Sequence, residues 1–116
     1  MTNSRSKGKR GELEIAKYLE GRGYRARRGQ QYCGANGDAD VVGVPGLHIE
    51  VKRTEQLRAY QYLEQAGDDA RDGEIPAVFH RQSRRDWIVI LDKDDFMDLY
   101  ESAYRNDHGH FPWDAD

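Results

Sequence analysis

The chain has 116 residues, of which 37% are hydrophobic and 34% are charged, and its net charge is −3. This length suffices for one domain with one modest core. No apolar run approaches the roughly 18 residues of a membrane span, and the N-terminus lacks the apolar stretch of a secretory signal. The single cysteine, Cys33, excludes an internal disulfide framework and a multi-cysteine zinc site. We therefore expect a cytoplasmic protein.

Positive and negative charges are unevenly divided along the chain. Residues 1–35 hold nine Lys or Arg and three Glu, a balance of +6, whereas residues 36–116 have a balance of −9. Because phosphate neutralisation supplies most non-specific affinity for nucleic acids, the basic N-terminal third predicts a polyphosphate contact. A solvated, charged helix is the alternative interpretation.

The first half of the chain predicts one helix and a pair of strands. A helical period over residues 7–22 is followed by glycines, which commonly end helices. The glycine-rich basic stretch 29–37 predicts a loop. Residues 40–44 and 47–52 then read as two strands joined by the turn Pro45-Gly46.

The second half predicts two helices around two further strands. A helix is expected over 55–70 and strands over 77–80 and 87–91. Asp92 or Asp94 can cap a last helix. In the first of these helices, the side chains expected to face the core are Tyr60, Leu63, Ala66 and Ala70. The last helix carries apolar residues at helical spacing, namely Phe96, Leu99, Tyr100 and Ala103.

The order of elements predicts the fold class. Helix, two strands, helix, two strands and helix indicate an α/β fold with a mixed central sheet flanked by helices. We expect a single domain over residues 1–104 and a flexible tail over 105–116.

Glu12 stands out on the first predicted helix. At about 100° per residue, Glu12 falls inside the apolar arc of Ile15, Ala16 and Leu19, facing the sheet. A lone carboxylate in that position is costly to bury unless something pairs with it. The alternative is a partly exposed glutamate that the positive end of the helix dipole favours.

The two predicted strands bring further charged residues together. Leu47, Ile49 and Val51 point to one face, and His48, Glu50 and Lys52 to the other. A Pro-Gly turn suits type II, which matches two-residue hairpins poorly. With a three-residue loop instead, residue 43 pairs with residue 47, and Asp40 lies opposite Glu50.

Carboxylates held this close repel each other unless a cation lies between them. Oxygen-rich, partly hydrated sites suit Mg²⁺, or Mn²⁺ as a substitute. Such an ion activates water and stabilises charge on a phosphoryl group, and the adjacent Lys52 can serve the water or the transition state. Asp40 and Glu50 are therefore candidate metal ligands for phosphodiester hydrolysis.

These residues resemble the PD-(D/E)xK nuclease superfamily. The motif reads Gly37-Asp38-Ala39-Asp40, nine residues, then Glu50-Val51-Lys52, with alanine in place of the motif's proline. With the basic helix that carries Glu12, the pattern looks like the Holliday junction resolvase branch of archaea and phages. The resemblance covers about residues 7–53. It implies a restriction-endonuclease-like fold and a Mg²⁺-dependent homodimer that cuts four-way DNA junctions. It also implies that Glu12, Asp40, Glu50 and Lys52 are catalytic and that Asp40, Glu50 and Glu12 are metal ligands, with Asp38 as a second acidic candidate beside Asp40.

Other functions are compatible with the same residues. Another restriction-like or repair endonuclease of the superfamily, a catalytically silent DNA-binding module and a protein-interaction domain are the alternatives. Gln65 follows the E-x-K strand, where related nucleases often carry a polar active-site residue. Cys33 is expected to be inert, and His108 with His110 lacks a third metal ligand. The basic residues proposed to contact DNA are Lys7, Lys9, Arg10, Arg25, Arg27, Arg28 and Arg53, with Arg81, Arg84 and Arg85 as further candidates.

Overall fold

The computed structural model describes residues 4–30 and 39–114, so Cys33 and Asp38 lie outside the described residues. Its centre is one five-stranded sheet, in which β3 and β4 run parallel and every other neighbouring pair runs antiparallel. This confirms the predicted α/β class with a mixed sheet. In spatial order the strands are β1 (Arg27–Arg28), β2 (Val41–Val42), β3 (Leu47–Arg53), β4 (Ile75–Arg81) and β5 (Ile88–Ile90).

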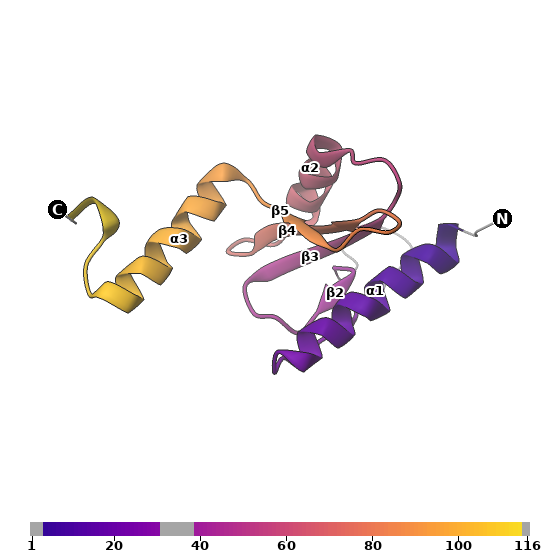
Figure 1. The fold of residues 1–116 in the computed structure, drawn as a ribbon, viewed down its shortest axis with the longest axis horizontal. Helices are drawn as coiled ribbons and strands as arrows, with labels where there is room; N and C mark the ends of the chain where they lie inside the picture. Colours follow the sequence, from indigo (N-terminus) through magenta and orange to yellow (C-terminus); the bar gives the residue numbers. More distant parts are fainter. Residues whose placement is uncertain (1–3, 31–38, 115–116) are drawn as a thin grey trace.

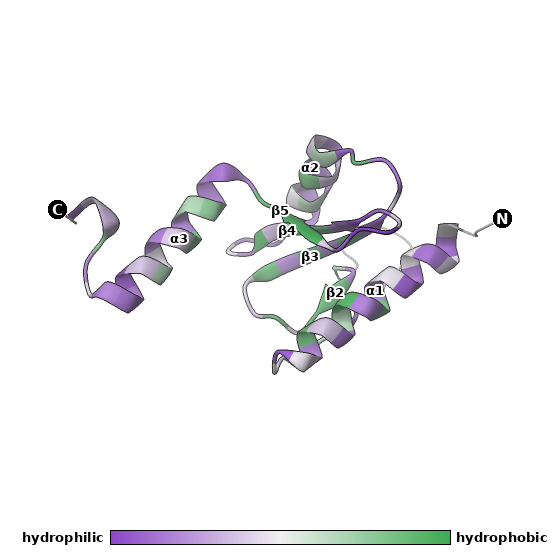
Figure 2. Ribbon diagram, viewed as in Figure 1, coloured by the Kyte–Doolittle hydropathy of each residue, from purple (hydrophilic) through white to green (hydrophobic). Residues whose placement is uncertain are grey.

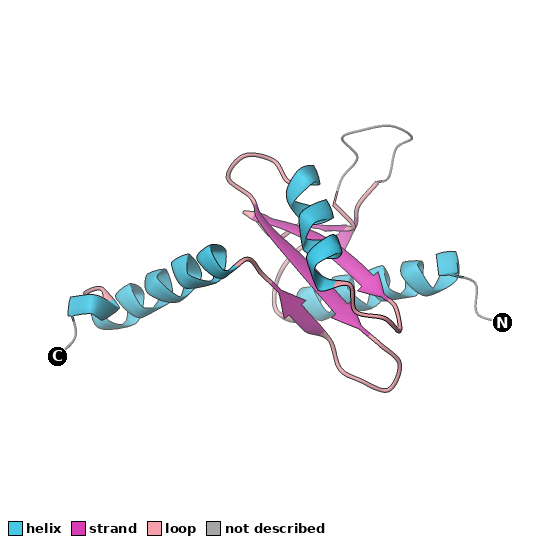
Figure 3. Cartoon of the chain, turned by 90° about the horizontal axis from the view of Figure 1, so that it is seen from above, coloured by secondary structure: helices cyan, strands magenta, loops and turns pink. Residues whose placement is uncertain are grey.

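Two helices cover opposite faces of this sheet. The first, α1 (Ser4–Gly21), packs on one face, and α2 (Ala59–Asp69) packs on the other (Figures 1 and 3). Parallel strands need a crossover connection, and α2 supplies it between β3 and β4. The last helix, α3 (Lys93–His108), extends away from the sheet and is followed by the short 3₁₀ turn η1 (Pro112–Asp114).

The main core lies between α1 and the sheet. Ile15 and Leu19 of α1 pack against Ile49 and Val51 of β3, and all four side chains are buried. This core follows the predicted alternation along residues 47–52, because the odd-numbered residues of β3 face α1. Gly11 permits close packing there, since an added Cβ would lie 3.2 Å from Cβ of Arg53.

The second core, beneath α2, differs from the sequence-based expectation. Tyr62 and Ala66 are buried against Val78 of β4, and Leu63 is partly buried beside them. The prediction for Tyr60 was wrong, because its side chain is 92% exposed. The helix begins at Ala59, later than expected, and its buried side follows the spacing of Tyr62 and Ala66.

The turn between β2 and β3 sets the position of Asp40. Leu47 N donates to Val44 O over 3.2 Å, and Gly46 at the third turn position has φ +84°, as a type II turn requires. Val41 pairs with Ile49. The predicted register is therefore confirmed, and Asp40 comes opposite Glu50.

Three features of the chain were not predicted. Arg27 and Arg28 form an edge strand, β1, which pairs with β2. The boundary expected after residue 104 falls inside α3, which continues to His108, whereas the cap of this helix, Asp92, is one of the two predicted candidates. The side chains of Phe96, Leu99 and Tyr100 are exposed. No helix among the described residues is long and apolar enough to cross a membrane.

Gly43 provides a test of the β2–β3 geometry. Its φ is +108°, and an added Cβ would lie 2.2 Å from the carbonyl oxygen of Arg25, whereas the Cβ position of Gly46 is open. We expect Gly43→Ala to lower the free energy of unfolding by about 3 kcal/mol or more, because strain and backbone collision add together. Gly46→Ala is the matched control and should cost about 1 kcal/mol. Urea titrations give both values, and equal losses would contradict the close approach of Gly43 to the backbone of Arg25 and Ala26.

Candidate active site

Asp40 and Glu50 come together at the β2–β3 pair. Asp40 immediately precedes β2, and its Oδ2 accepts a hydrogen bond of 2.8 Å from Val51 N on β3. The carboxyl groups of Asp40 and Glu50 are also hydrogen-bonded to each other. Two carboxyl groups in this arrangement share a proton or require a cation.

The electrostatics of the pair are asymmetric. Burial and the Glu50 carboxylate raise the pKa of Asp40 to about 8, and the Glu12 charge adds to this shift. Burial works against the charge of Glu50, but hydrogen bonds from His48 and Asp40 outweigh it and lower the pKa of Glu50. At neutral pH the metal-free pair therefore holds one proton between its two carboxyl groups.

His48 is the partner of Glu50 that sequence reasoning missed. Its Nε2 lies 2.7 Å from Glu50 Oε1, its Nδ1 lies 3.7 Å from Glu74 Oε1, and its side chain is buried. The hydrogen bond to Glu50 raises the pKa of His48. The alternation of β3 placed His48 on the same face as Glu50, and that was the available signal.

Lys52 lies farther along the same face of β3. Its Nζ donates to Gln65 Oε1 of α2 over 3.1 Å and lies 5.4 Å from the centroid of the Tyr62 ring. These two contacts from α2 position the ammonium group without neutralising it. Gln65, expected from the sequence as a polar neighbour of the site, therefore contacts Lys52.

Glu12 approaches the pair from α1. Its side chain is 17% exposed, and its Oε1 accepts a hydrogen bond of 2.9 Å from Nε of Arg28 on β1. This ion pair compensates the cost of burying the Glu12 carboxylate, and it joins α1 to β1 at the edge of the sheet. The charge of Glu12 acts on Asp40, but Arg28 is its hydrogen-bonding partner.

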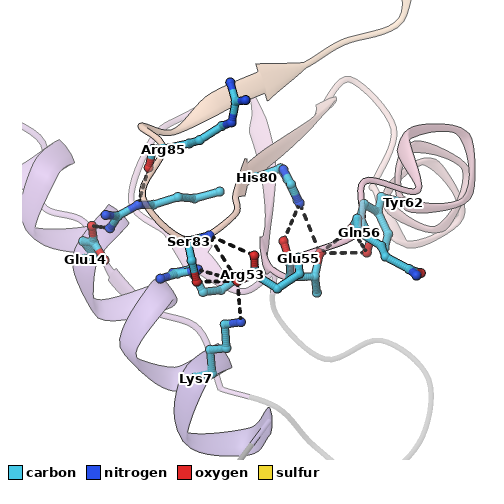
Figure 4. Close-up of polar contacts among 11 residues, drawn as sticks. Lys7, Glu14, Arg53, Glu55, Gln56, Tyr62, His80, Ser83 and Arg85 are labelled. Carbon is cyan, nitrogen blue, oxygen red and sulfur yellow. Dashed lines mark hydrogen bonds and ion pairs between the residues drawn. The ribbon is translucent and has the colours of Figure 1, made fainter. Parts of the chain in front are cut away.

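A second polar network joins α1 to the β4–β5 loop (Figure 4). Glu55 accepts hydrogen bonds from Lys7 Nζ at 3.1 Å and from the backbone and hydroxyl of Ser83, which together lower its pKa to about 2. Glu14 accepts from Arg81 over 2.6 Å and from the indole of Trp87 over 3.0 Å. Lys7 and Arg81 thus have carboxylate partners within the protein.

The other predicted DNA-contacting residues lie around α1 and β1. Lys9, Arg10, Arg25 and Arg27 are exposed. Arg53 Nη1 lies 4.0 Å from Glu55 Oε1, beyond hydrogen-bonding distance, and is buried. The four exposed residues are therefore accessible to a polyanion.

A possible cation site extends beyond the predicted ligand set. Ligand atoms of His48, Glu50 and Asp69 all lie within 4.8 Å of one another. Among the described residues, this is the group of three or more His, Cys, Asp or Glu side chains that comes this close together. A cleft of about 350 Å³ opens beside it and is lined by His48, Asp69 and Glu74 among others, but not by Asp40 or Glu50. Glu50 is the residue that both arrangements share.

Known proteins resemble this chain in sequence and in fold. The family model described as "Phage putative PDDEXK endonuclease" matches residues 3–114. A 1.6 Å structure of Hjc, a Holliday junction resolvase from the archaeal hyperthermophile Archaeoglobus fulgidus, is 28% identical, with a TM-score of 0.55, over 73% of this chain and 72% of that one. Comparison with curated proteins gave no match.

The structural match also confirms the restriction-endonuclease-like fold. The sequence match spans nearly the whole chain, from the basic first helix through the last one. The chain belongs to the phage PDDEXK endonuclease family and resembles the resolvase branch of PD-(D/E)xK nucleases.

Proposed function

We propose that this protein is a divalent-metal-dependent endonuclease that cleaves phosphodiester bonds in four-way DNA junctions as a homodimer. The observation that carries the proposal is the pairing of Asp40 with Glu50 beside Lys52 in a chain of an endonuclease family. The resemblance to Hjc, which is a Holliday junction resolvase, supports branched DNA as the substrate. We infer that it acts in the cytoplasm of the cell that contains this DNA.

The donor chemistry of the pair fits Mg²⁺, with Mn²⁺ as a substitute. Two adjacent carboxyl groups that hold one proton between them offer the hard oxygen ligands that these ions prefer. Asp40 and Glu50 would hold the ion, and Glu12 would complete the acidic site if Arg28 releases it. When bound, a divalent ion stabilises charge on phosphoryl oxygens and lowers the pKa of water.

The surrounding residues then have separate roles. His48 binds Oε1 of Glu50 and so fixes the orientation of that carboxylate. Lys52, positioned by Gln65, brings a positive charge to the scissile phosphate and can orient the attacking water. Lys9, Arg10, Arg25 and Arg27 would contact phosphates, because they are exposed and positively charged.

Cleavage and binding should be separable by mutation. We expect Lys52→Ala to cut a labelled four-way junction about 10²–10³-fold more slowly than wild type, because it lacks a group that stabilises the transition state. Binding to the junction, measured by gel shift in EDTA, should persist. Lys17→Ala, which removes an exposed lysine of α1, is the matched control. Cutting at the wild-type rate by folded Lys52→Ala would mean that the assignment of Lys52 is wrong.

Substitution of exposed arginines tests DNA binding in place of cleavage. Arg25→Ala combined with Arg27→Ala should weaken binding and flatten its dependence on salt, because fewer counterions are released. A linear duplex of matched sequence tests substrate preference. Equal cleavage of both DNAs would favour a restriction-like or repair endonuclease, and binding without cleavage would favour a DNA-binding module.

The shared proton of Asp40 predicts the pH dependence of stability in the metal-free protein. Because the pKa of Asp40 is about 8 in the folded state against 3.8 ordinarily, the unfolded chain releases this proton first. The resulting loss of stability is absent below about pH 4, grows as the pH rises and is complete above about pH 8. Asp40→Asn keeps an acceptor for Val51 N and removes the ionisation.

We therefore expect Asp40→Asn to melt at a higher temperature than wild type at pH 8 to 9 in EDTA, with the difference shrinking towards pH 4. Mg²⁺ or Mn²⁺ should raise the melting temperature of the wild type more than that of Asp40→Asn. Asp68→Asn, on the exposed side of α2, is the control. A lower melting temperature for Asp40→Asn in EDTA at high pH would contradict the repulsion between Asp40 and Glu50.

A further inference from the structure

The last helix, α3, lacks a packing partner among the described residues. None of its 16 residues is buried, and its main contact with another element is with η1, which directly follows it. Figures 1 and 3 show α3 extending from the end of β5, away from the sheet and from α1 and α2. The connection from β5 is only two residues long, and Asp92 caps the helix through Asp94 N and Asp95 N.

The sequence of α3 is nevertheless that of a packed helix. At about 100° per residue, its apolar side chains fall within an arc of about 160°. Within that arc the exposed fraction is 55% for Phe96, 44% for Met97, 43% for Leu99 and 45% for Tyr100. Figure 2 shows the hydrophobic positions along α3 among hydrophilic ones. An exposed apolar stripe of this kind marks an interaction surface.

The charges inside the stripe indicate which partner fits. Lys93 and Asp107 are the charged residues of α3 that fall within the apolar arc, and they lie near opposite ends of the helix. Tyr100 is midway between them. When two copies of α3 run antiparallel and cross at Tyr100, Lys93 comes opposite Asp107 of the partner subunit, and both such pairs join opposite charges.

Two further pairs of residues within the stripe agree with this register. The same crossing places Phe96 opposite Tyr104 of the partner subunit, and Met97 opposite Ala103 of the partner subunit, a large side chain against a small one. The ends of the helix are complementary as well. Acidic residues occupy the first turn and basic residues the last turn, so antiparallel helices bring opposite charges and opposite dipole ends together.

We propose that α3 pairs antiparallel with the α3 of a second copy of this chain, with Tyr100 at the two-fold axis. This pairing identifies the surface of the homodimer, and in that respect it rests on the proposed function. Large apolar side chains offer roughly 150–250 Å² each, so four half-exposed ones on each of two helices bury on the order of 800 Å². That area is below the standard size of a stable interface, so the dimer is expected to dissociate at about micromolar concentration.

Sedimentation equilibrium of the full chain without DNA or metal tests the pairing. The wild type should pass from monomer to dimer between about 1 and 500 µM. Tyr100→Asp should weaken association about tenfold or more, since it places two like charges together at the axis. Ser102→Asp makes the same charge change on the opposite side of α3, where the residue is exposed, and should leave association unchanged. Circular dichroism verifies that each variant is folded.

Charge reversal tests the antiparallel register. Lys93→Glu alone and Asp107→Lys alone each place like charges opposite each other and should weaken the dimer several-fold, whereas the double variant should restore it. A wild type that stays monomeric, an undiminished dimer of Tyr100→Asp, or a double variant as weak as the single ones would overturn the proposal. A monomeric wild type would assign α3 to a different partner. Because the DNA-cleavage assay reports separately on the nuclease, failure of either proposal is distinguishable from failure of the other.

Discussion

The candidate site depends on two carboxyl groups held in contact across β2 and β3. Asp40 and Glu50 are opposite each other because a type II turn at Val44–Leu47 sets the register, and Val51 N fixes Asp40 in place. Burial makes their mutual repulsion strong enough that one proton remains on the pair at neutral pH. A divalent cation can replace that proton and neutralise both groups. Repulsion between the two carboxylates thus favours the binding of a divalent ion.

The two faces of β3 have different roles, one in the core and one in the candidate site. Ile49 and Val51 face α1 and belong to the main core, whereas Glu50 and Lys52 face the side covered by α2. Three polar contacts then hold the charged side chains of the site in position. His48 binds Glu50, Gln65 binds Lys52, and Arg28 binds Glu12. The apolar face of β3 therefore provides the rigid base on which these polar contacts are positioned.

The local patterns of the sequence predicted much of this arrangement. Alternation along residues 47–52 identified the face that carries Glu50 and Lys52, and the Pro45-Gly46 turn predicted the pairing with Asp40. Contacts between distant segments were not predictable in the same way. The pairing of Arg28 with Glu12 depends on β1, a two-residue strand whose partner is remote in sequence, and nothing in the local pattern of Arg27-Arg28 specifies it.

The errors of prediction at the helices have a common physical cause. Periodicity gives the spacing of an apolar stripe but not the helix boundary or the surface that it meets. Tyr60 was assigned to the core with Leu63 at helical spacing, but α2 faces the sheet with Tyr62 and Ala66. Phe96 and Leu99 have the spacing of core residues, yet they are exposed on α3. The proposed dimer would cover them with the same helix of another copy of the chain.

The position of a bound ion decides whether Asp40 and Glu50 form the metal site. Crystals of the protein soaked in Mn²⁺ would give anomalous density at the position of the metal. We predict a peak coordinated by both Asp40 and Glu50, and loss of that peak in crystals of Asp40→Asn. A peak held by His48 and Asp69 without Asp40, or no peak at the carboxylate pair in folded wild-type protein, would contradict the assignment of these two carboxylates as the metal ligands.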